Sequence, residues 1–161
     1  MVAIVIADAS PLIALARVNG IVWLQDLFGE VVVTTVELRE VLTGRFPESE
    51  APIETALAAG WLKSVAVEMA DPALPDLDEG EAASIRLALA QSFGIRLAGT
   101  AAVIGMARQR GLIPSAKAVF AQLHASDFRS APAVIHAVLD RCGESVKGCR
   151  HQAHILGGLV A

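Results

Sequence analysis

Charged side chains and long apolar runs are both scarce in this sequence of 161 residues. Only 19% of the residues are charged and 54% are hydrophobic, a composition too apolar for a disordered chain. No stretch reaches the roughly 18 uninterrupted apolar residues that a membrane-spanning helix needs. Residues 1–7 are apolar but lack a basic flank and stop at Asp8, which argues against a secretory signal. The composition therefore predicts one soluble domain with a sizeable core.

Cysteine is also scarce, and the two that occur, Cys142 and Cys149, lie close to the C-terminus. Together with His151 and His154 they form the spacing C-x6-C-x-H-x2-H, which raises the question of zinc. Structural zinc sites usually hold cysteines about two to four residues apart on a tight turn, so this spacing does not favour zinc. Reduced thiols in a cytoplasmic protein are the simpler interpretation.

The net charge of −4 is unevenly distributed along the chain. Residues 1–92 carry a balance of −9, whereas residues 93–161 carry +5. A basic half can hold a polyanion while an acidic pocket in the other half holds a cation. Ordinary surface variation explains the same distribution, and charge alone favours that explanation.

Apolar periodicity predicts strands that alternate with helices along most of the chain. Residues 2–7 form an aliphatic run, typical of a strand buried on both faces. Ser10 is a good N-cap, and Pro11 a good first residue, for the helix that follows. This alternation predicts a parallel, doubly wound sheet with its ligand site beyond the carboxyl ends of the strands. Later strands are expected at residues 31–33, 61–67 and 95–98, and helices at 11–28 with a pause at 19–20, 35–42, 49–59, 78–91, 100–110, 115–125 and 131–141.

Three carboxylates occur at the start of a predicted helix or close to a strand end. Each could bind a metal, and each also has a purely structural explanation. Asp8 follows the first strand, where desolvation is costly unless the carboxylate is paired, hydrogen-bonded or bound to a metal. Its alternative is to cap the next helix together with Ser10. Glu40 would otherwise be a solvated helical residue, and Glu81 would otherwise complete a capping box with Asp78. If the three converge, their oxygens suit Mg²⁺ or Mn²⁺, which are hard cations.

The order of these motifs resembles the PIN-domain family. The segment VIADASPLI (residues 5–13) resembles the opening of a PIN domain, in which the first Asp is a metal ligand supported by the Ser or Thr two residues on. The segment FGEVVV (28–33) with Glu40 resembles the second motif, and LDEGEAASI (77–85) resembles the third. Residues 94–103, 110–114 and 118–144 are similar to an uncharacterised PIN subgroup related to VapC-like toxins.

The resemblance implies a fold and an activity. The fold would be a PIN-like, Rossmann-like parallel sheet of four to five strands flanked by helices, with a helical C-terminal end, over residues 1–144; residues 145–161 would form a tail. The activity would be that of an endoribonuclease that depends on Mg²⁺ or Mn²⁺. The implied metal ligands are Asp8, Glu40 and Glu81, and the implied substrate-site residues are Ser10, which would orient Asp8, and Arg96 and Arg108, which would contact phosphate.

The resemblance also implies partners and a location. RNA would be the substrate, and the protein would be a cytoplasmic homodimer. It would be the toxin of a toxin–antitoxin pair, with an antitoxin protein as its partner.

The sequence departs from the family pattern at one point. Family members normally have a strand that ends in one or two aspartates, followed by a helix, before the block that begins at Gly94. Here Ser92 runs directly into Phe93, and no acidic residue lies between Glu81 and Asp127. A fourth carboxylate therefore has no counterpart, and the loss of a central strand would expose hydrogen-bonding edges on its neighbours.

This departure leaves two further functions open. A degenerate PIN fold could bind a partner protein or RNA without cleaving it, and the high hydrophobic content would then supply an apolar contact surface. A nucleotide-binding α/β module is the third candidate, but the sequence has neither a G-x-G-x-x-G motif after the first strand nor a P-loop.

The intact mass of the purified protein tests the junction between Ser92 and Phe93. A mass of 16.8 kDa, which the 161 residues give, indicates a true deletion. A mass larger by about one strand and one helix indicates that residues lie between the two. Mass spectrometry distinguishes these outcomes directly.

Overall fold

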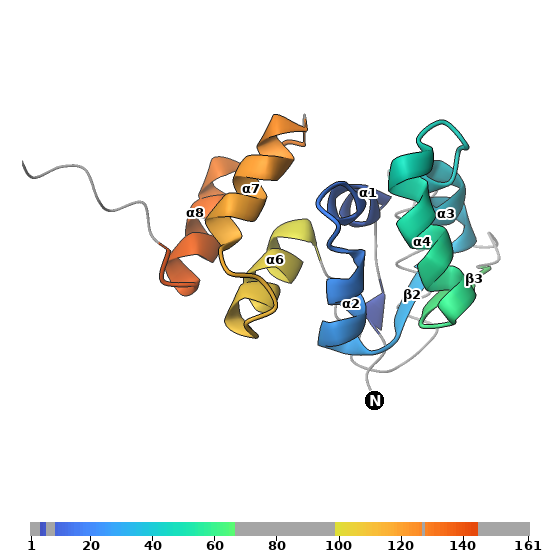
Figure 1. The fold of residues 1–161 in the computed structure, drawn as a ribbon, viewed down its shortest axis with the longest axis horizontal. Helices are drawn as coiled ribbons and strands as arrows, with labels where there is room; N and C mark the ends of the chain where they lie inside the picture. Colours follow the sequence, from blue (N-terminus) through green and yellow to red (C-terminus); the bar gives the residue numbers. More distant parts are fainter. Residues whose placement is uncertain (1–3, 6–8, 67–98, 127, 145–161) are drawn as a thin grey trace, which may run out of the picture.

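A small parallel sheet organises the first half of the chain (Figure 1). The computed structural model describes residues 4–5, 9–66, 99–126 and 128–144. Strands β1 (Ile4–Val5), β2 (Val31–Thr34) and β3 (Leu62–Val65) pair in the order β1-β2-β3, and both pairings are parallel. All four residues of β2 are buried, as expected for a central strand of a parallel sheet.

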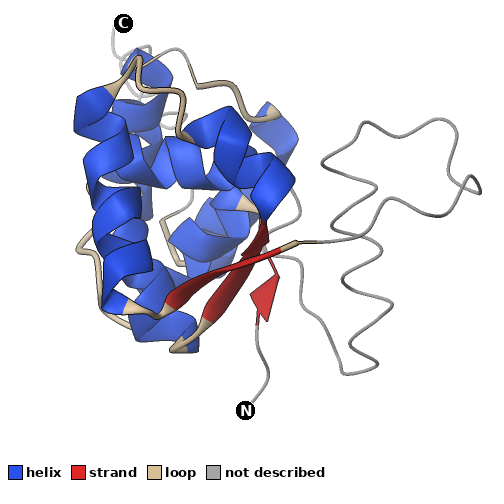
Figure 2. Ribbon diagram, turned by 90° about the vertical axis from the view of Figure 1, so that its right-hand side faces the viewer, coloured by secondary structure: helices blue, strands red, loops and turns tan. Residues whose placement is uncertain are grey.

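Helices connect these strands and extend the fold beyond them. Figure 2 shows the strands beside a body that consists mostly of helices. Helix α6 contacts α1 and α2 on one side and α7 and α8 on the other, so it joins the two halves of the molecule. No helix among the described residues is long and apolar enough to cross a membrane. The helices are α1 (Ala9–Arg17), α2 (Ile21–Phe28), α3 (Thr35–Val41), α4 (Pro47–Ala59), α6 (Thr100–Gln109), α7 (Ala116–Ala125) and α8 (Pro132–Arg141).

A tight turn separates α1 from α2. Asn19 adopts the left-handed conformation, with φ of 54°, and the Gly20 amide donates to the Leu15 carbonyl at 2.7 Å. The ring of Trp23 lies so close to Gly20 that an added Cβ would meet it at 2.5 Å. Glycine is therefore required at residue 20 by close packing, and the pause expected at residues 19–20 is confirmed.

One hydrophobic core runs through both halves of the described chain. Leu139 connects α8 to this core, and the largest side chains that are fully buried come from α1, α2, β2, α3, α4, β3, α6 and α7. They are Leu12, Leu15, Leu24, Val31, Val33, Glu37, Ile53, Leu62, Ile104 and Leu123. Glu37 is the one charged residue in this set, and its setting is described below.

The parallel arrangement agrees with the sequence predictions, and the structure corrects those predictions at two places. The described residues contain three strands, fewer than the four to five expected. Helix α1 begins at Ala9, so Ser10 lies in its first turn and is not the N-cap that was expected before Pro11. Assigned and predicted helix ends commonly differ by one or two residues. The predicted helix at 78–91, the strand at 95–98 and the tail at 145–161 lie outside the described residues.

Glu144 joins three helices at the end of the described chain. Its carboxylate accepts hydrogen bonds from the Ser115 hydroxyl at 2.9 Å and from the backbone amides of Ala116 (3.1 Å) and Lys117 (2.9 Å). Arg108 of α6 completes the set with an ion pair of 2.6 Å. The hydrogen bond from the Lys117 amide contributes most to holding the pKa of Glu144 at about 2, below its ordinary value of 4.5, although burial works against that shift.

Replacing Glu144 by Gln should destabilise the protein in a pH-dependent way. Near neutral pH, the free energy of unfolding should fall by about 1.5–3 kcal/mol, the usual net contribution of hydrogen bonds to a charged group. Because the folded-state pKa is lowered, the carboxylate stabilises the fold above pH 4.5 and loses this effect as pH falls toward 2. Urea denaturation from pH 7 to pH 2 checks the prediction, and Glu48→Gln at an exposed residue is the control. A constant difference across this range would contradict it.

Candidate active site

The carboxyl ends of β1 and β2 lie at the same edge of the sheet, because the two strands are adjacent and parallel. Helix α1 begins at Ala9, four residues after β1 ends at Val5, and α3 begins directly after β2 ends at Thr34. This edge is where the sequence predicts a ligand site, beyond the carboxyl ends of the strands. The N-termini of α1 and α3 therefore lie at the same edge of the sheet.

Thr34 and Glu37 form a reciprocal capping box at this edge. The Glu37 amide donates to the Thr34 hydroxyl oxygen at 3.3 Å. In return, Glu37 Oε2 accepts from the Thr34 amide at 3.3 Å and from the Thr34 hydroxyl at 3.1 Å. Only 1% of Glu37 is exposed. A carboxylate buried to this degree is costly unless hydrogen bonds or a cation compensate it.

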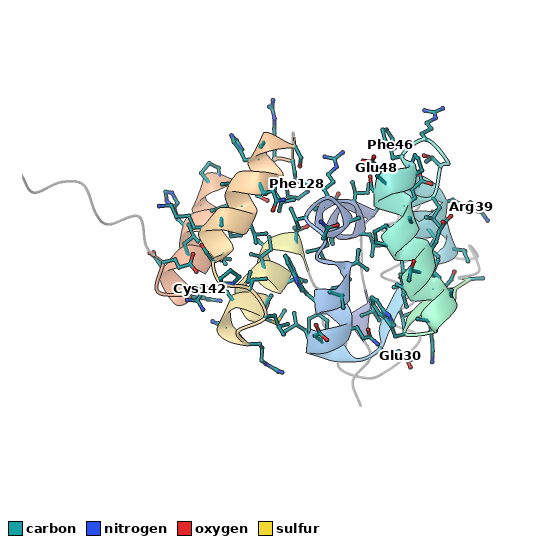
Figure 3. All side chains as sticks on the ribbon, in the orientation of Figure 1. Glu30, Arg39, Phe46, Glu48, Phe128 and Cys142 are labelled. Atoms are coloured by element: carbon teal, nitrogen blue, oxygen red, sulfur yellow. The ribbon has the colours of Figure 1, made fainter. Side chains whose placement is uncertain are left out.

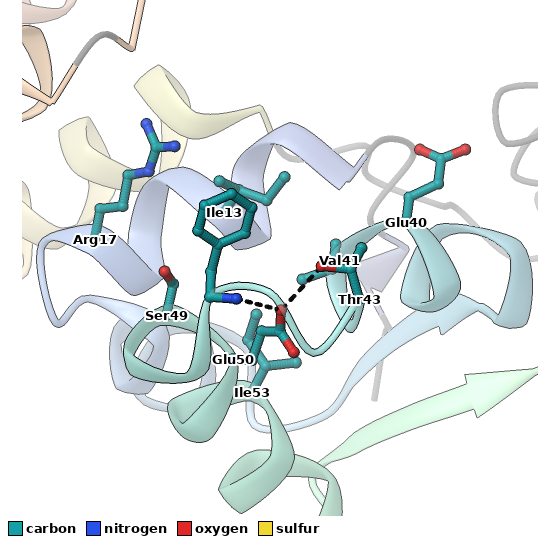
Figure 4. Close-up of a pocket in the computed structure, with 9 residues that line it drawn as sticks. Ile13, Arg17, Glu40, Val41, Thr43, Ser49, Glu50 and Ile53 are labelled. Atoms are coloured by element: carbon teal, nitrogen blue, oxygen red, sulfur yellow. Dashed lines mark hydrogen bonds between the residues drawn. The ribbon is translucent and has the colours of Figure 1, made fainter.

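Glu37 was missed by sequence reasoning, which singled out Glu40 on the same helix. The missed signal is the Thr-x-x-Glu pattern that comes directly after a strand, and this pattern is a capping box by its spacing alone. Glu40 lies one turn later, is exposed, and lines a pocket between helices (Figure 4). Residues three apart on a helix are neighbours on its surface, so the buried carboxylate and the pocket adjoin one another.

Three of the predicted site residues lie outside the described residues: Asp8, Glu81 and Arg96. Ser10 is described and is exposed in the first turn of α1. Within the ranges that the structure describes, no group of three or more His, Cys, Asp or Glu side chains could hold a metal ion. The predicted ligand set is therefore neither assembled nor excluded by the described part of the chain.

Arg108 has a contact that sequence reasoning did not foresee. Its Nε lies 2.6 Å from Glu144 Oε1, so the guanidinium holds α6 against the start of α7. The predicted contact with phosphate stays a prediction. The geometry supports a structural role for Arg108, because the residue joins helices and is only 36% exposed at its side chain.

The pocket beside Glu40 has a volume of about 110 Å³. It lies between α1, α3, the loop that follows α3, and α4, and it combines an apolar floor with a polar rim. Its lining residues are Ile13, Arg17, Glu40, Val41, Thr43, Phe46, Ser49, Glu50 and Ile53. Figure 4 shows Arg17 and Glu40 toward opposite ends of this lining.

Glu50 fixes the loop that forms one wall of the pocket. Its carboxylate accepts from the Gly44 amide at 2.8 Å, the Phe46 amide at 3.1 Å and the Thr43 hydroxyl at 3.1 Å. Burial acts to raise the pKa of Glu50, but these hydrogen bonds outweigh it and lower the pKa below 4.5. The loop is therefore closed around an ionised carboxylate that has its hydrogen bonds inside the protein.

A family model for the PIN domain matches the chain over residues 4–92 and 88–144. The chain belongs to the PIN-domain family. This confirms the family predicted from the sequence motifs, whereas the relation to VapC-like toxins stays a prediction. No curated protein and no solved structure was similar enough to be matched.

The match of the PIN domain is made in two segments that meet at residues 88–92. The junction at Ser92 and Phe93, where the sequence analysis expects the loss of a strand and a helix, falls at the end of this overlap. The carboxyl edge formed by β1 and β2 belongs entirely to the first segment. The capping box and the pocket are therefore parts of the PIN domain that lie before the departure.

Thr34→Ala should weaken this PIN domain by removing both hydroxyl contacts with Glu37. Loss of a threonine N-cap costs about 0.5–2 kcal/mol in the free energy of unfolding. Thr55→Ala is the matched control, because the Thr55 hydroxyl is exposed and bonds only to the Ala51 carbonyl within α4. Urea denaturation measures the free energy of unfolding of both variants. Equal losses in the two variants would mean that the capping box has no special effect.

Proposed function

We propose that this PIN domain is a metal-dependent endoribonuclease with its active site at the carboxyl edge of β1 and β2. The observation that carries the proposal is that, in a chain of the PIN family, this edge leads directly into helix α3, whose Glu40 carboxylate is exposed and forms no ion pair among the described residues. The carboxyl edge is also where a parallel sheet binds ligands.

The chemistry of the donors fits Mg²⁺ or Mn²⁺. Both cations prefer carboxylate oxygens. We propose Asp8, Glu40 and Glu81 as the ligands, on the strength of their sequence motifs. Glu40 is exposed and open to a cation, whereas Glu37, one turn earlier, is buried and its carboxylate accepts hydrogen bonds from Thr34.

The proposed reaction is hydrolysis of a phosphodiester bond in RNA. A bound Mg²⁺ or Mn²⁺ would supply an activated water and offset charge on the leaving oxygen. Ser10 is proposed to orient Asp8, and the capping box of Thr34 and Glu37 fixes the start of the helix that carries Glu40. Basic residues of the second half, among them Arg96, are proposed to hold the phosphates, because residues 93–161 carry a balance of +5.

The finer features of the proposal rest on the motif resemblance. They are a fourth strand at residues 95–98, a helical C-terminal end, a cytoplasmic homodimer, and a toxin that an antitoxin protein restrains. Each extends the family assignment to properties that the PIN domain alone does not fix.

A non-cleaving PIN fold is the second candidate function. The observation that favours it is the absence of any acidic residue between Glu81 and Asp127, where the family has a fourth carboxylate. A site with one ligand fewer holds a divalent cation less tightly. The protein would then bind RNA or a partner protein through the same fold.

The nuclease proposal predicts RNA cleavage in the presence of Mg²⁺ or Mn²⁺ that is lost in Asp8→Ala and in Glu40→Gln. Both changes remove a negative charge from the proposed metal site while a control, Glu54→Gln on the exposed face of α4, should keep full activity. Cleavage of a labelled single-stranded RNA, followed on a gel, measures the effect. Undiminished cleavage by the Asp8→Ala protein would exclude this site as the catalytic centre.

Metal titration separates the two candidate functions. The nuclease should bind Mn²⁺ in the millimolar range or tighter, and Glu81→Gln should weaken that binding. Isothermal titration calorimetry measures it with the intact protein. A wild-type protein without such binding would favour the non-cleaving fold.

A further inference from the structure

Three helix ends meet at one end of the second half of the molecule. The C-termini of α6 and α8 lie there beside the N-terminus of α7, and Cys142, the residue after α8, is labelled at this end in Figure 3. Figure 1 shows these three helices on one side of α1 and α2, with α3 and α4 on the other side. The end carries Arg110, Lys117 and Arg141, which together we call the helix-end basic surface.

We propose that the helix-end basic surface binds backbone phosphates of the RNA substrate, away from the bond that is cleaved. The inference rests on the proposed function, which makes RNA the ligand. Each of the three side chains would contact its own phosphate along the strand, so no single group of the ligand has to touch all three. Phosphate contacts position a nucleic acid and carry no sequence information. The surface should therefore bind RNA whatever its bases.

Glu144 holds the three helix ends together. Its carboxylate lies 2.6 Å from Arg108 Nε near the end of α6 and 2.9 Å from the Lys117 amide at the start of α7. Its own amide donates to a carbonyl in the last turn of α8 at 2.8 Å. Because consecutive Cα atoms are about 3.8 Å apart, Arg110 lies within about 8 Å of Arg108, and Arg141 within about 11 Å of Glu144, by their Cα atoms. The three basic residues therefore surround one fixed carboxylate.

The cations of this surface are open to an anionic ligand. All three are exposed, and none forms an ion pair with any residue that the structure describes. Glu144 does not compete for them, because its side chain is only 16% exposed and its carboxylate is already paired with Arg108. Asp140 is the one exposed carboxylate among the described residues of the second half. Three unpaired cations therefore stand against one exposed anion.

The charge distribution favours this end of the molecule for a polyanion. Residues 1–92 carry a balance of −9, which repels RNA, and residues 93–161 carry +5. Four of the five Lys and Arg residues that the structure describes in the second half lie at this end. The fifth, Arg129, lies in the connection from α7 to α8, at the opposite end of both helices. The described cations of the basic half are therefore concentrated at the three helix ends.

The surface lacks the apolar centre that a protein partner usually requires. Of the exposed large hydrophobic side chains that the structure describes, only Leu112, which is 38% exposed, lies at this end. The others, Val22, Phe46 and Val134, belong to α2, to the loop before α4 and to the first turn of α8. Protein interfaces depend on a few buried aromatic or aliphatic anchors, whereas phosphate binding needs exposed cations. RNA is therefore the better ligand for this surface.

The salt dependence of RNA binding without metal tests the surface separately from catalysis. The probe is a short fluorescent oligouridylate, and the assay is fluorescence anisotropy in EDTA over a series of KCl concentrations. Each phosphate contact with a single strand contributes about 0.7 to the slope of log affinity against log salt. Replacing Arg110, Lys117 and Arg141 together by Gln should therefore lower the slope by about 2. Over a tenfold range of salt, this change corresponds to roughly a hundredfold in affinity.

Matched variants separate the surface from net charge. Arg110→Gln alone should lower the slope by about 0.7, whereas Arg129→Gln removes the same charge from the same half and should leave the slope unchanged. Arg110→Lys combined with Arg141→Lys keeps the charge of the surface and should keep the slope. An oligoadenylate probe should show the same changes in slope, because phosphate contacts do not read bases. Circular dichroism checks that each variant is folded.

The outcomes distinguish this inference from the nuclease proposal. An unchanged slope in the triple variant overturns the inference and leaves an acidic protein segment as the better partner of the surface. Equal changes in Arg110→Gln and Arg129→Gln also overturn it, because overall charge would then attract the RNA. If the slopes change as predicted but the protein never cleaves RNA with Mg²⁺ or Mn²⁺, the nuclease proposal fails and the RNA-binding surface stands.

Discussion

The reciprocal hydrogen bonds between Thr34 and Glu37 determine how the central strand is joined to the helix after it. They satisfy the first amides of α3 at the residue where β2 ends, so the chain changes from strand to helix without a loop. This junction brings one carboxylate to the carboxyl edge of the sheet and keeps it buried. It also places the next glutamate, Glu40, at the mouth of the pocket. The proposed metal site therefore depends on this one helix start.

The elements with strong local signals were predicted well from the sequence. The aliphatic run of β2, the turn at Asn19 and Gly20, and the helix expected at residues 115–125 agree with the structure, because each depends on residues close in sequence. The contact between Arg108 and Glu144 was not foreseen, since the residues are 36 apart and only the packing of α6 against α7 and α8 brings them together. Structure that depends on residues close in sequence could be predicted, whereas contacts between residues far apart in sequence could not.

The candidate site shows the same division. Sequence patterns placed the second acidic motif at Glu40 on α3, and its role as a ligand stays a prediction. Periodicity describes a helix face and not its depth, so the burial of Glu37 one turn earlier was not foreseen. The Thr-x-x-Glu spacing explains that burial, because it makes Glu37 the partner of a capping box. Only the surroundings of each glutamate distinguish the two.

The carboxylate of Glu144 has a consequence for where the domain ends. The last helix, α8, stops at Arg141, yet four hydrogen bonds that hold α6 and α7 together come from a residue three positions farther on. A chain shortened at the end of α8 would keep every described helix and lose this junction. A border drawn at the end of the last described helix would therefore cut through a contact that joins three helices.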